Sequence, residues 1–221
     1  MITTVDVETS YQKTETGGYD PSPFHPDNIL VSVGINDEYY FTNHSERIDE
    51  GCYHKIQAIL DKTTLLVGHN IKFDLMWLLE SGFKYSGKVY DTMLGEYILN
   101  RGIRKSLTLE MSCRRRKIGS KDNRIKEYTD RGIPFQNIPA DVVEEYGRMD
   151  VEITRKLFDS QMSDLKMAKN KGLLMTAKMM NEFLIVLSDM ERNGINIDLD
   201  DLSKVEKEYR AEFAYLKQKI D

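Results

Sequence analysis

Apolar and polar positions follow two periods along the first hundred residues. Alternation with a period of two, or a short continuous apolar run, predicts β-strands over residues 3–9, 28–35, 38–42, 64–70 and 88–92. Apolar residues at helical spacing predict helices over residues 45–62, 70–82 and 92–100, with Ser45 and Asn70 as N-caps. This order of elements predicts an α/β layered domain with a mixed sheet flanked by helices.

The pattern changes twice in the remainder of the chain. Residues 101–139 are polar and predict a surface excursion with one or two short helices, before a long helix that begins near Pro139. After Gly172 the sequence predicts a strongly apolar helix and then an amphipathic one. We therefore expect a first domain over residues 1–170 and a C-terminal helical extension over residues 171–221.

Composition and charge exclude several classes of protein. The chain has 221 residues, 40% of them hydrophobic, and a formal net charge of -5, which excludes a basic nucleic-acid coat protein but not a local basic patch. Its two cysteines, Cys52 and Cys113, form no metal-binding pair and predict no disulfide framework. There is no secretory signal, and no apolar run approaches about 18 residues. An intracellular, cytoplasmic protein without membrane segments is expected.

Two carboxylates stand close together on the first predicted strand. In VDVETS, Asp6 and Glu8 are two residues apart, so on a strand both side chains leave the same face. Repulsion and desolvation disfavour two like charges there unless a cation neutralises them. This pair alone is a weak signal, because the same pattern recurs on many exposed strands.

Two predicted helices carry further acids on faces that are otherwise apolar. Asp74 follows Asn70 by four residues, and Asp150 follows Tyr146 by four, so each pair shares one helical face. Each pair alone also fits an ordinary capping or surface role. Together the four carboxylates predict a site for two divalent metal ions about 3.5–4 Å apart, which can perform phosphoryl transfer. Hard oxygen ligands suit Mg²⁺ or Mn²⁺.

Three segments in this order resemble the motifs of a known family. VDVETS, GHNIKFDLMWL and YGRMDVEIT are similar to the three exonuclease motifs of the DEDD exonucleases, and the tyrosine places the chain in the DEDDy branch. VYDTMLGEYILN also resembles that family. Residues 184–209 resemble the stretch that joins the proofreading domain of family A DNA polymerases to their thumb. The resemblance implies a ribonuclease H-like exonuclease fold, cut just inside the polymerase domain and without a polymerase active site.

The resemblance also implies an activity and a set of roles. The implied reaction is metal-dependent 3′–5′ hydrolysis that releases nucleoside 5′-monophosphates from a single-stranded or frayed DNA 3′ end, which is proofreading. The implied partners are that DNA end and the polymerase domain, which is missing here, and a monomer is expected. The implied metal ligands are Asp6, Glu8, Asp74 and Asp150. Tyr146 would orient the attacking water, and Asn70 would contact the terminal nucleotides.

Two further residues are candidates for binding substrate, each with an ordinary alternative. Tyr11 lies where relatives carry an apolar wedge and could stack on a base, or it is a surface loop residue. Arg115, in the basic run 114–117, could bind phosphates, or this run is a solvated basic loop. Two other functions stay open: a ribonuclease D-like 3′–5′ exoribonuclease, and a non-catalytic DNA-binding module.

Overall fold

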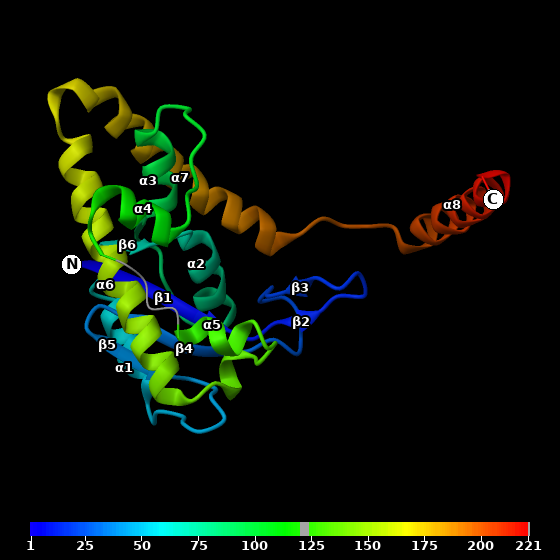
Figure 1. The fold of residues 1–221 in the computed structure, drawn as a ribbon, viewed down its shortest axis with the longest axis horizontal. Coiled ribbons are helices and arrows are strands. Elements are labelled where there is room, and N and C mark those ends of the chain that lie inside the picture. Colours follow the sequence, from blue (N-terminus) through cyan, green and yellow to red (C-terminus); the bar gives the residue numbers. More distant parts are fainter. Residues whose placement is uncertain (120–123, 221) are drawn as a thin grey trace. The chain divides into compact units, whose positions relative to one another are not determined.

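The computed structural model describes residues 1–119 and 124–220, so residues 120–123 of the predicted basic segment lie outside the described part. The chain forms two compact units, residues 1–188 and residues 189–221. Figure 1 shows the order of the elements along the chain.

The first unit is built on a five-stranded mixed sheet in the order β5-β4-β1-β6-β7. β1 pairs in parallel with β6 and antiparallel with β4, β6 pairs in parallel with β7, and β4 pairs antiparallel with β5. The predicted α/β fold with a mixed sheet is therefore confirmed. The strands are β1 (Ile2–Thr9), β4 (Leu30–Ile35), β5 (Glu38–Phe41), β6 (Leu65–Gly68) and β7 (Lys88–Asp91).

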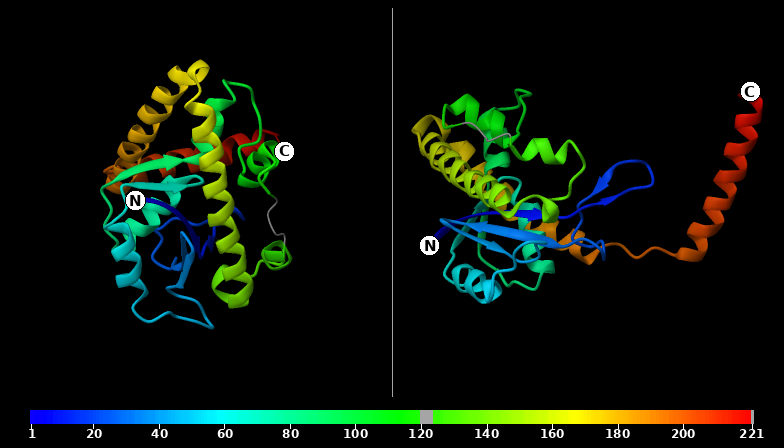
Figure 2. Two further views of the ribbon diagram at one scale, coloured as in Figure 1. Left: turned by 90° about the vertical axis from the view of Figure 1, so that its left-hand side faces the viewer. Right: turned by 60° about the horizontal axis from the view of Figure 1, so that its bottom comes forward.

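Helices cover both faces of this sheet. α6 lies against β1, β4, β5 and β6, and both views of Figure 2 show it, in yellow-green, along the sheet. The other face packs against α1 and α2 around Val5, Val7 and Ile56. The helices of this unit are α1 (Cys52–Leu60), α2 (Ile71–Glu80), α3 (Thr92–Leu99), α4 (Leu109–Arg116), α5 (Arg124–Thr129), α6 (Ala140–Leu165) and most of α7 (Lys171–Asn193).

The alternation of β1 decides which side chains meet α6. Val5 and Val7 belong to the core that α1 and α2 cover, so Asp6 and Glu8 leave the opposite face. Asp6 lies opposite Gly34 in the ladder, and Glu8 lies opposite Ser32. The central position of β1 in the sheet thus brings two acids under the long helix α6.

The N-terminal half of the predicted helix over residues 45–62 does not form. α1 begins at Cys52, after Gly51 in the left-handed region with φ of 66°. Ser45 is not the N-cap: its hydroxyl donates a hydrogen bond of 2.6 Å to the carbonyl of Gln136. A tertiary contact has replaced the local cap. The structure also adds a small hairpin, β2 (Gln12–Lys13) with β3 (Tyr19–Asp20), after β1.

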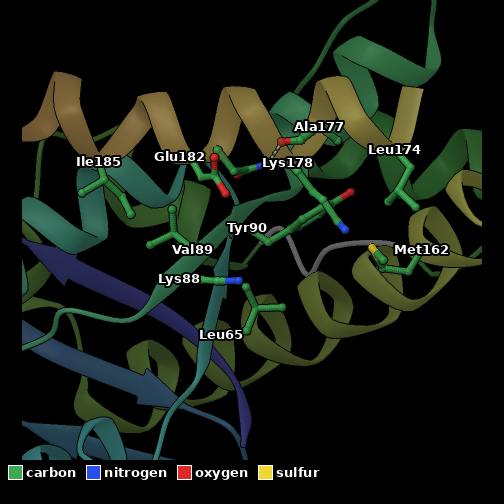
Figure 3. A pocket seen from close by; sticks show the side chains of 11 residues that line it. Leu65, Lys88, Val89, Tyr90, Met162, Leu174, Ala177, Lys178, Glu182 and Ile185 are labelled. Carbon is green, nitrogen blue, oxygen red and sulfur yellow. Dashed lines mark hydrogen bonds between the residues drawn. The ribbon is translucent and has the colours of Figure 1, made fainter. Parts of the chain in front are cut away.

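The first compact unit extends past residue 170, where a domain boundary is predicted. Ala177 and Leu184 of α7 are buried, and the Asn181 side chain accepts a 2.7 Å hydrogen bond from the backbone of Asp91. Figure 3 shows α7 above β6 and β7, around an apolar pocket of about 350 Å³. Most of α7 therefore completes this unit, and the division into functional domains stays a prediction.

The second unit contains the end of α7, an irregular connection and α8 (Leu199–Ile220). α8 has no buried residue. The two helices predicted after residue 170 are present as α7 and α8. None of the helices in the described part of the chain is long and apolar enough to span a membrane.

Candidate active site

Three of the four predicted acids form one cluster. Asp6 and Glu8 come from β1, and Asp150 comes from α6 above them. One carboxylate oxygen of each lies within 4.8 Å of the others. Glu8 and Asp150 are buried and Asp6 is partly exposed, so the cluster is closed on the side of the core and open toward solvent.

Asp74 brings the fourth carboxylate from the first turn of α2. It is 3% exposed, and its Oδ1 accepts a 3.0 Å hydrogen bond from the backbone N–H of Val7, between the two acids of β1. Burial raises the pKa of Asp74 well above its ordinary value, the charge of Asp6 raises it further, and the hydrogen bond from Val7 opposes both. Ionised Asp74 is therefore unfavourable here unless a cation lies beside it.

Tyr146 lies one helical turn before Asp150 on α6. Its ring packs near Phe135, with 6.2 Å between the ring centroids. Burial raises the pKa of Tyr146 far above its ordinary value, and the charges of Glu8, Asp150 and Asp6 and a hydrogen bond with Asp150 act in the same direction. The raised pKa keeps the phenol protonated at neutral pH, so it can donate a hydrogen bond and is a poor base.

These five side chains line one cleft of about 570 Å³. Its other walls come from β1, from the start of α2 and α3, and from the segment that enters α4. Among the described residues that line it there is neither a lysine nor an arginine: Asp6, Val7, Glu8, His69, Phe73, Asp74, Met93, Leu107, Thr108, Leu109, Tyr146 and Asp150. The cleft is thus strongly anionic, and carboxylate oxygens are the donors that hard divalent cations prefer. The residues present fit a divalent metal.

Asn70 occupies the N-cap position of α2, but its side chain does not cap the helix. It adopts the left-handed conformation with φ of 64°, and its side chain is exposed. Its backbone N–H instead donates a 2.9 Å hydrogen bond to Oδ1 of Asp91, the acid of the VYDT segment. Asp91 also caps α3 through the N–H of Met93 at 2.8 Å. One carboxylate therefore holds the starts of α2 and α3 together beside the cleft.

Tyr11 and Arg115 do not line the cleft. Tyr11 is partly buried and meets Tyr19 of the hairpin edge to face, with 4.6 Å between ring centroids. Arg115 hydrogen-bonds Glu96 at 3.3 Å and donates to the carbonyl of Ser106 at 2.7 Å. The predicted substrate contacts of both residues stay predictions, and Arg115 already has internal partners.

His69 is part of the cleft although the sequence motifs do not single it out. Its Nε2 lies 2.9 Å from the carbonyl oxygen of Leu107, and its Nδ1 lies 2.9 Å from Oγ1 of Thr92. It thereby fixes the segment before α4 as a wall of the cleft. The only hint in the sequence is its position directly before Asn70.

A family model described as 3′–5′ exonuclease matches residues 11–166. The chain belongs to this family, the 3′–5′ exonuclease domain of family A DNA polymerases. The matched range contains Asp74, Tyr146 and Asp150. It begins after Asp6 and Glu8, so the structure rather than the match brings those two acids into the site.

The exonuclease chain resembles longer polymerases over part of their length. It is 26% identical over 144 residues to DNA polymerase I of Borreliella burgdorferi, which covers 65% of this chain and 15% of that protein. It is 26% identical over 228 residues to the DNA polymerase of Bacillus phage SP01, covering 96% of this chain and 24% of that protein. The chain therefore spans a quarter or less of the length of these two relatives.

Solved structures share the fold at low identity. Brucella melitensis NrnC bound to pGG matches with a TM-score of 0.64 and 17% identity, over 87% of this chain and 85% of that one. The likeness is one of fold, and the predicted fold class, a ribonuclease H-like fold with a mixed sheet flanked by helices, is confirmed. Membership of the family implies dependence on divalent metal, which the cluster of Asp6, Glu8 and Asp150 fits.

Proposed function

We propose that this exonuclease domain removes nucleoside 5′-monophosphates one at a time from DNA 3′ ends, using two divalent metal ions. The observation that carries the proposal is the meeting of four acids and one neutral tyrosine in a single cleft. These five residues come from three separate motifs, which are carried by β1, α2 and α6. The family supports exonuclease chemistry, and the number of ions is our inference from the number of carboxylates.

The carboxylates divide into two overlapping sets. Asp6, Glu8 and Asp150 have oxygens close enough to share one ion. Asp74 accepts a hydrogen bond from the N–H of Val7 and lies near Asp6. Asp74 and Asp6 would therefore be the ligands of a second ion. When bound, such ions lower the pKa of a water and stabilise the charge on the departing 3′ oxygen. Mg²⁺ or Mn²⁺ suits the all-oxygen donor set, and NrnC has also been solved with bound Mg²⁺.

Tyr146 and Glu8 would orient the attacking water. A phenol that stays neutral can donate one hydrogen bond, and an ionised carboxylate can accept one. A water held between the two has a defined direction of attack on the phosphorus. We therefore assign Tyr146 a positioning role, since a phenol with a raised pKa is a poor base at neutral pH.

The substrate is a single-stranded or frayed 3′ end of DNA. A mismatch lowers the cost of unpairing, so mismatched ends enter the cleft more often, and proofreading needs no reading of bases. The relatives are DNA polymerases, which favours DNA and a polymerase domain as the partner of this chain. A ribonuclease D-like activity on RNA is the competing function. Location inside the cell and a monomeric state remain our predictions.

The test is trimming of a single-stranded DNA oligonucleotide from its 3′ end in Mn²⁺, with and without chelator. We expect products one nucleotide shorter at each step, and none with chelator, with Asp6→Ala or with Asp150→Ala. Asp159→Ala is the matched control, because Asp159 is an exposed acid on the same helix that pairs with Arg155. Full activity of both Ala variants in the cleft would refute the proposal. Faster trimming of RNA than of DNA would favour the competing function.

A further inference from the structure

We propose that Arg104 and Lys105 bind the phosphates of the substrate strand upstream of the nucleotide being removed. This inference rests on the proposed function, since it concerns the strand whose 3′ end lies in the cleft. The pair belongs to the irregular segment between α3 and α4, which forms one wall of the cleft.

The chemistry of the cleft requires cations outside it. Its described lining contains four carboxylates and no lysine or arginine. Metal ions can neutralise the carboxylates and the phosphate that reacts, but a single strand carries a further negative charge at each nucleotide beyond it. Those phosphates approach a chain with net charge -5. Basic side chains near the rim are therefore needed to hold the strand.

The segment that carries the pair is anchored at the cleft. Leu107, Thr108 and Leu109 line the cleft, and the carbonyl of Leu107 meets Nε2 of His69 at 2.9 Å. The preceding carbonyl, of Ser106, accepts a 2.7 Å hydrogen bond from Arg115. The Cα atom of Lys105 thus lies within about 8 Å of that of Leu107. Both basic residues are held close to the rim.

Arg104 and Lys105 are available for an external partner, whereas the neighbouring basic run is partly used inside the protein. Both residues are exposed, and neither side chain makes a hydrogen bond or an ion pair within the described parts of the chain. In the run 114–117, by contrast, Arg115 pairs with Glu96 at 3.3 Å, and Arg116 pairs with Asp164 at 2.7 Å. The structure therefore favours residues 104–105 over Arg115 for phosphate binding.

The ligand is the phosphodiester backbone of a single strand. A guanidinium and an ammonium both bind phosphate oxygens and recognise no base. The binding should therefore depend on salt and on strand length but little on sequence. A dinucleotide bound in the cleft would lack most of these contacts.

The experiment measures binding of a labelled single-stranded DNA to the full chain as a function of salt. The binding buffer contains Ca²⁺ in place of Mg²⁺, and the DNA is analysed after the measurement to establish that it has not been hydrolysed. The variant is Arg104→Gln/Lys105→Gln, and the control, which loses the same charge, is Lys62→Gln/Lys84→Gln. Lys62 and Lys84 are exposed and lie at the other end of the parallel strands, where the amino group of Met1 donates to the carbonyl of Lys62. Melting curves of all proteins establish that they are folded.

We expect the Arg104→Gln/Lys105→Gln variant to bind roughly tenfold more weakly at low salt, with a slope of log K against log salt that is smaller by about 1.4. In the wild type, kcat/KM should be higher for a longer strand than for a dinucleotide. In the variant, this ratio should be smaller by the same factor as the loss of affinity. The control should keep the slope of the wild type. A folded variant with the slope and affinity of the wild type, or an equal loss in the control, would overturn the proposal. Failure of the wild type to trim DNA in Mn²⁺ would instead refute the proposed function, because the binding test does not depend on hydrolysis.

Discussion

Glu96 and Asp74 are both carboxylates that are 3% exposed, yet their surroundings are opposite. Glu96 on α3 accepts from Arg115 at 3.3 Å and from Arg116 at 2.8 Å, and Gln161 of α6 donates to it at 3.1 Å. Asp74 instead lies near the carboxylates of Asp6 and Asp91, and its Oδ1 accepts a hydrogen bond from the backbone N–H of Val7.

The difference separates a structural network from a site that needs a ligand. A buried charge that is paired and hydrogen-bonded holds helices together, and removing one partner leaves the others exposed to the desolvation cost. A buried charge among like charges gives the metal-free protein no such gain. A bound cation would offset the repulsion and desolvation of these carboxylates, so we assign the function to the acids of the cleft.

The largest effect should come from an acid of the cleft. Asp150→Asn keeps the shape but removes one negative charge from the cluster with Asp6 and Glu8. We expect the rate of trimming to fall by about 10³-fold or more, because metal ions contribute several kcal/mol to phosphoryl transfer. Single-turnover kinetics in Mn²⁺ measures this loss. A fall of less than tenfold would show that Asp150 is not a metal ligand.

The counterpart in the structural network should lose stability rather than activity. Glu96→Gln leaves Arg115 and Arg116 without their shared carboxylate, and the free energy of unfolding should fall by about 3 kcal/mol. Glu145→Gln is the control, because Glu145 and its partner Arg124 are both exposed and such pairs contribute about 1 kcal/mol or less. Denaturant unfolding measures both. If both variants lost the same free energy of unfolding, the buried ion pairs of Glu96 would contribute no more than the exposed pair of Glu145.

A smaller effect on the reaction is expected from the tyrosine. Tyr146→Phe removes only the hydroxyl group, so metal should still bind while kcat falls roughly 10–100-fold. The dependence of kcat on pH tests this role. Because burial and the nearby acids raise the pKa of Tyr146, the rate of neither protein should show a titration of the phenol between neutral and mildly alkaline pH. A profile whose alkaline limb disappears in the Phe variant would show that the phenol titrates in this range.

The smallest effect should arise at α7. Asn181→Ala leaves the N–H of Asp91 without its 2.7 Å acceptor, which should cost about 1.5 kcal/mol of stability and lower activity only modestly. Asn193→Ala, at the exposed end of the same helix, should change stability by less than about 0.5 kcal/mol. Thermal unfolding compares them. If Asn181→Ala is as mild as the control, α7 does not support the site through Asp91.

Local periodicity is what made much of this molecule predictable. A period of two placed Asp6 and Glu8 on one face of β1, and spacing by four placed Asp150 with Tyr146 on α6. Contacts between residues far apart in the sequence produce no local periodicity, so they could not be predicted in this way. His69 and Leu107 are 38 residues apart, and Ser45 and Gln136 are 91 apart, so neither the wall of the cleft nor the missing first half of α1 could be read locally. Arg115 belongs to the same class, since its carboxylate partner lies on another helix.

Asp74 offers the most direct test of the claim that the cleft is built for cations. Its pKa is raised in the folded protein, so the metal-free protein is more stable while Asp74 is protonated and loses that stability as the pH rises through the raised pKa. Metal-free Asp74→Asn should therefore melt at a higher temperature than the metal-free wild type at neutral pH.

The decisive measurement is the melting temperature of the wild type and Asp74→Asn during a titration with Mn²⁺ at neutral pH. We expect the wild type to gain about 5–10 °C when the Mn²⁺ concentration is about a hundredfold above its dissociation constant, and the variant to gain clearly less. A wild type whose melting temperature does not move with Mn²⁺, or a metal-free Asp74→Asn that melts below the metal-free wild type, would contradict this explanation of the four acids.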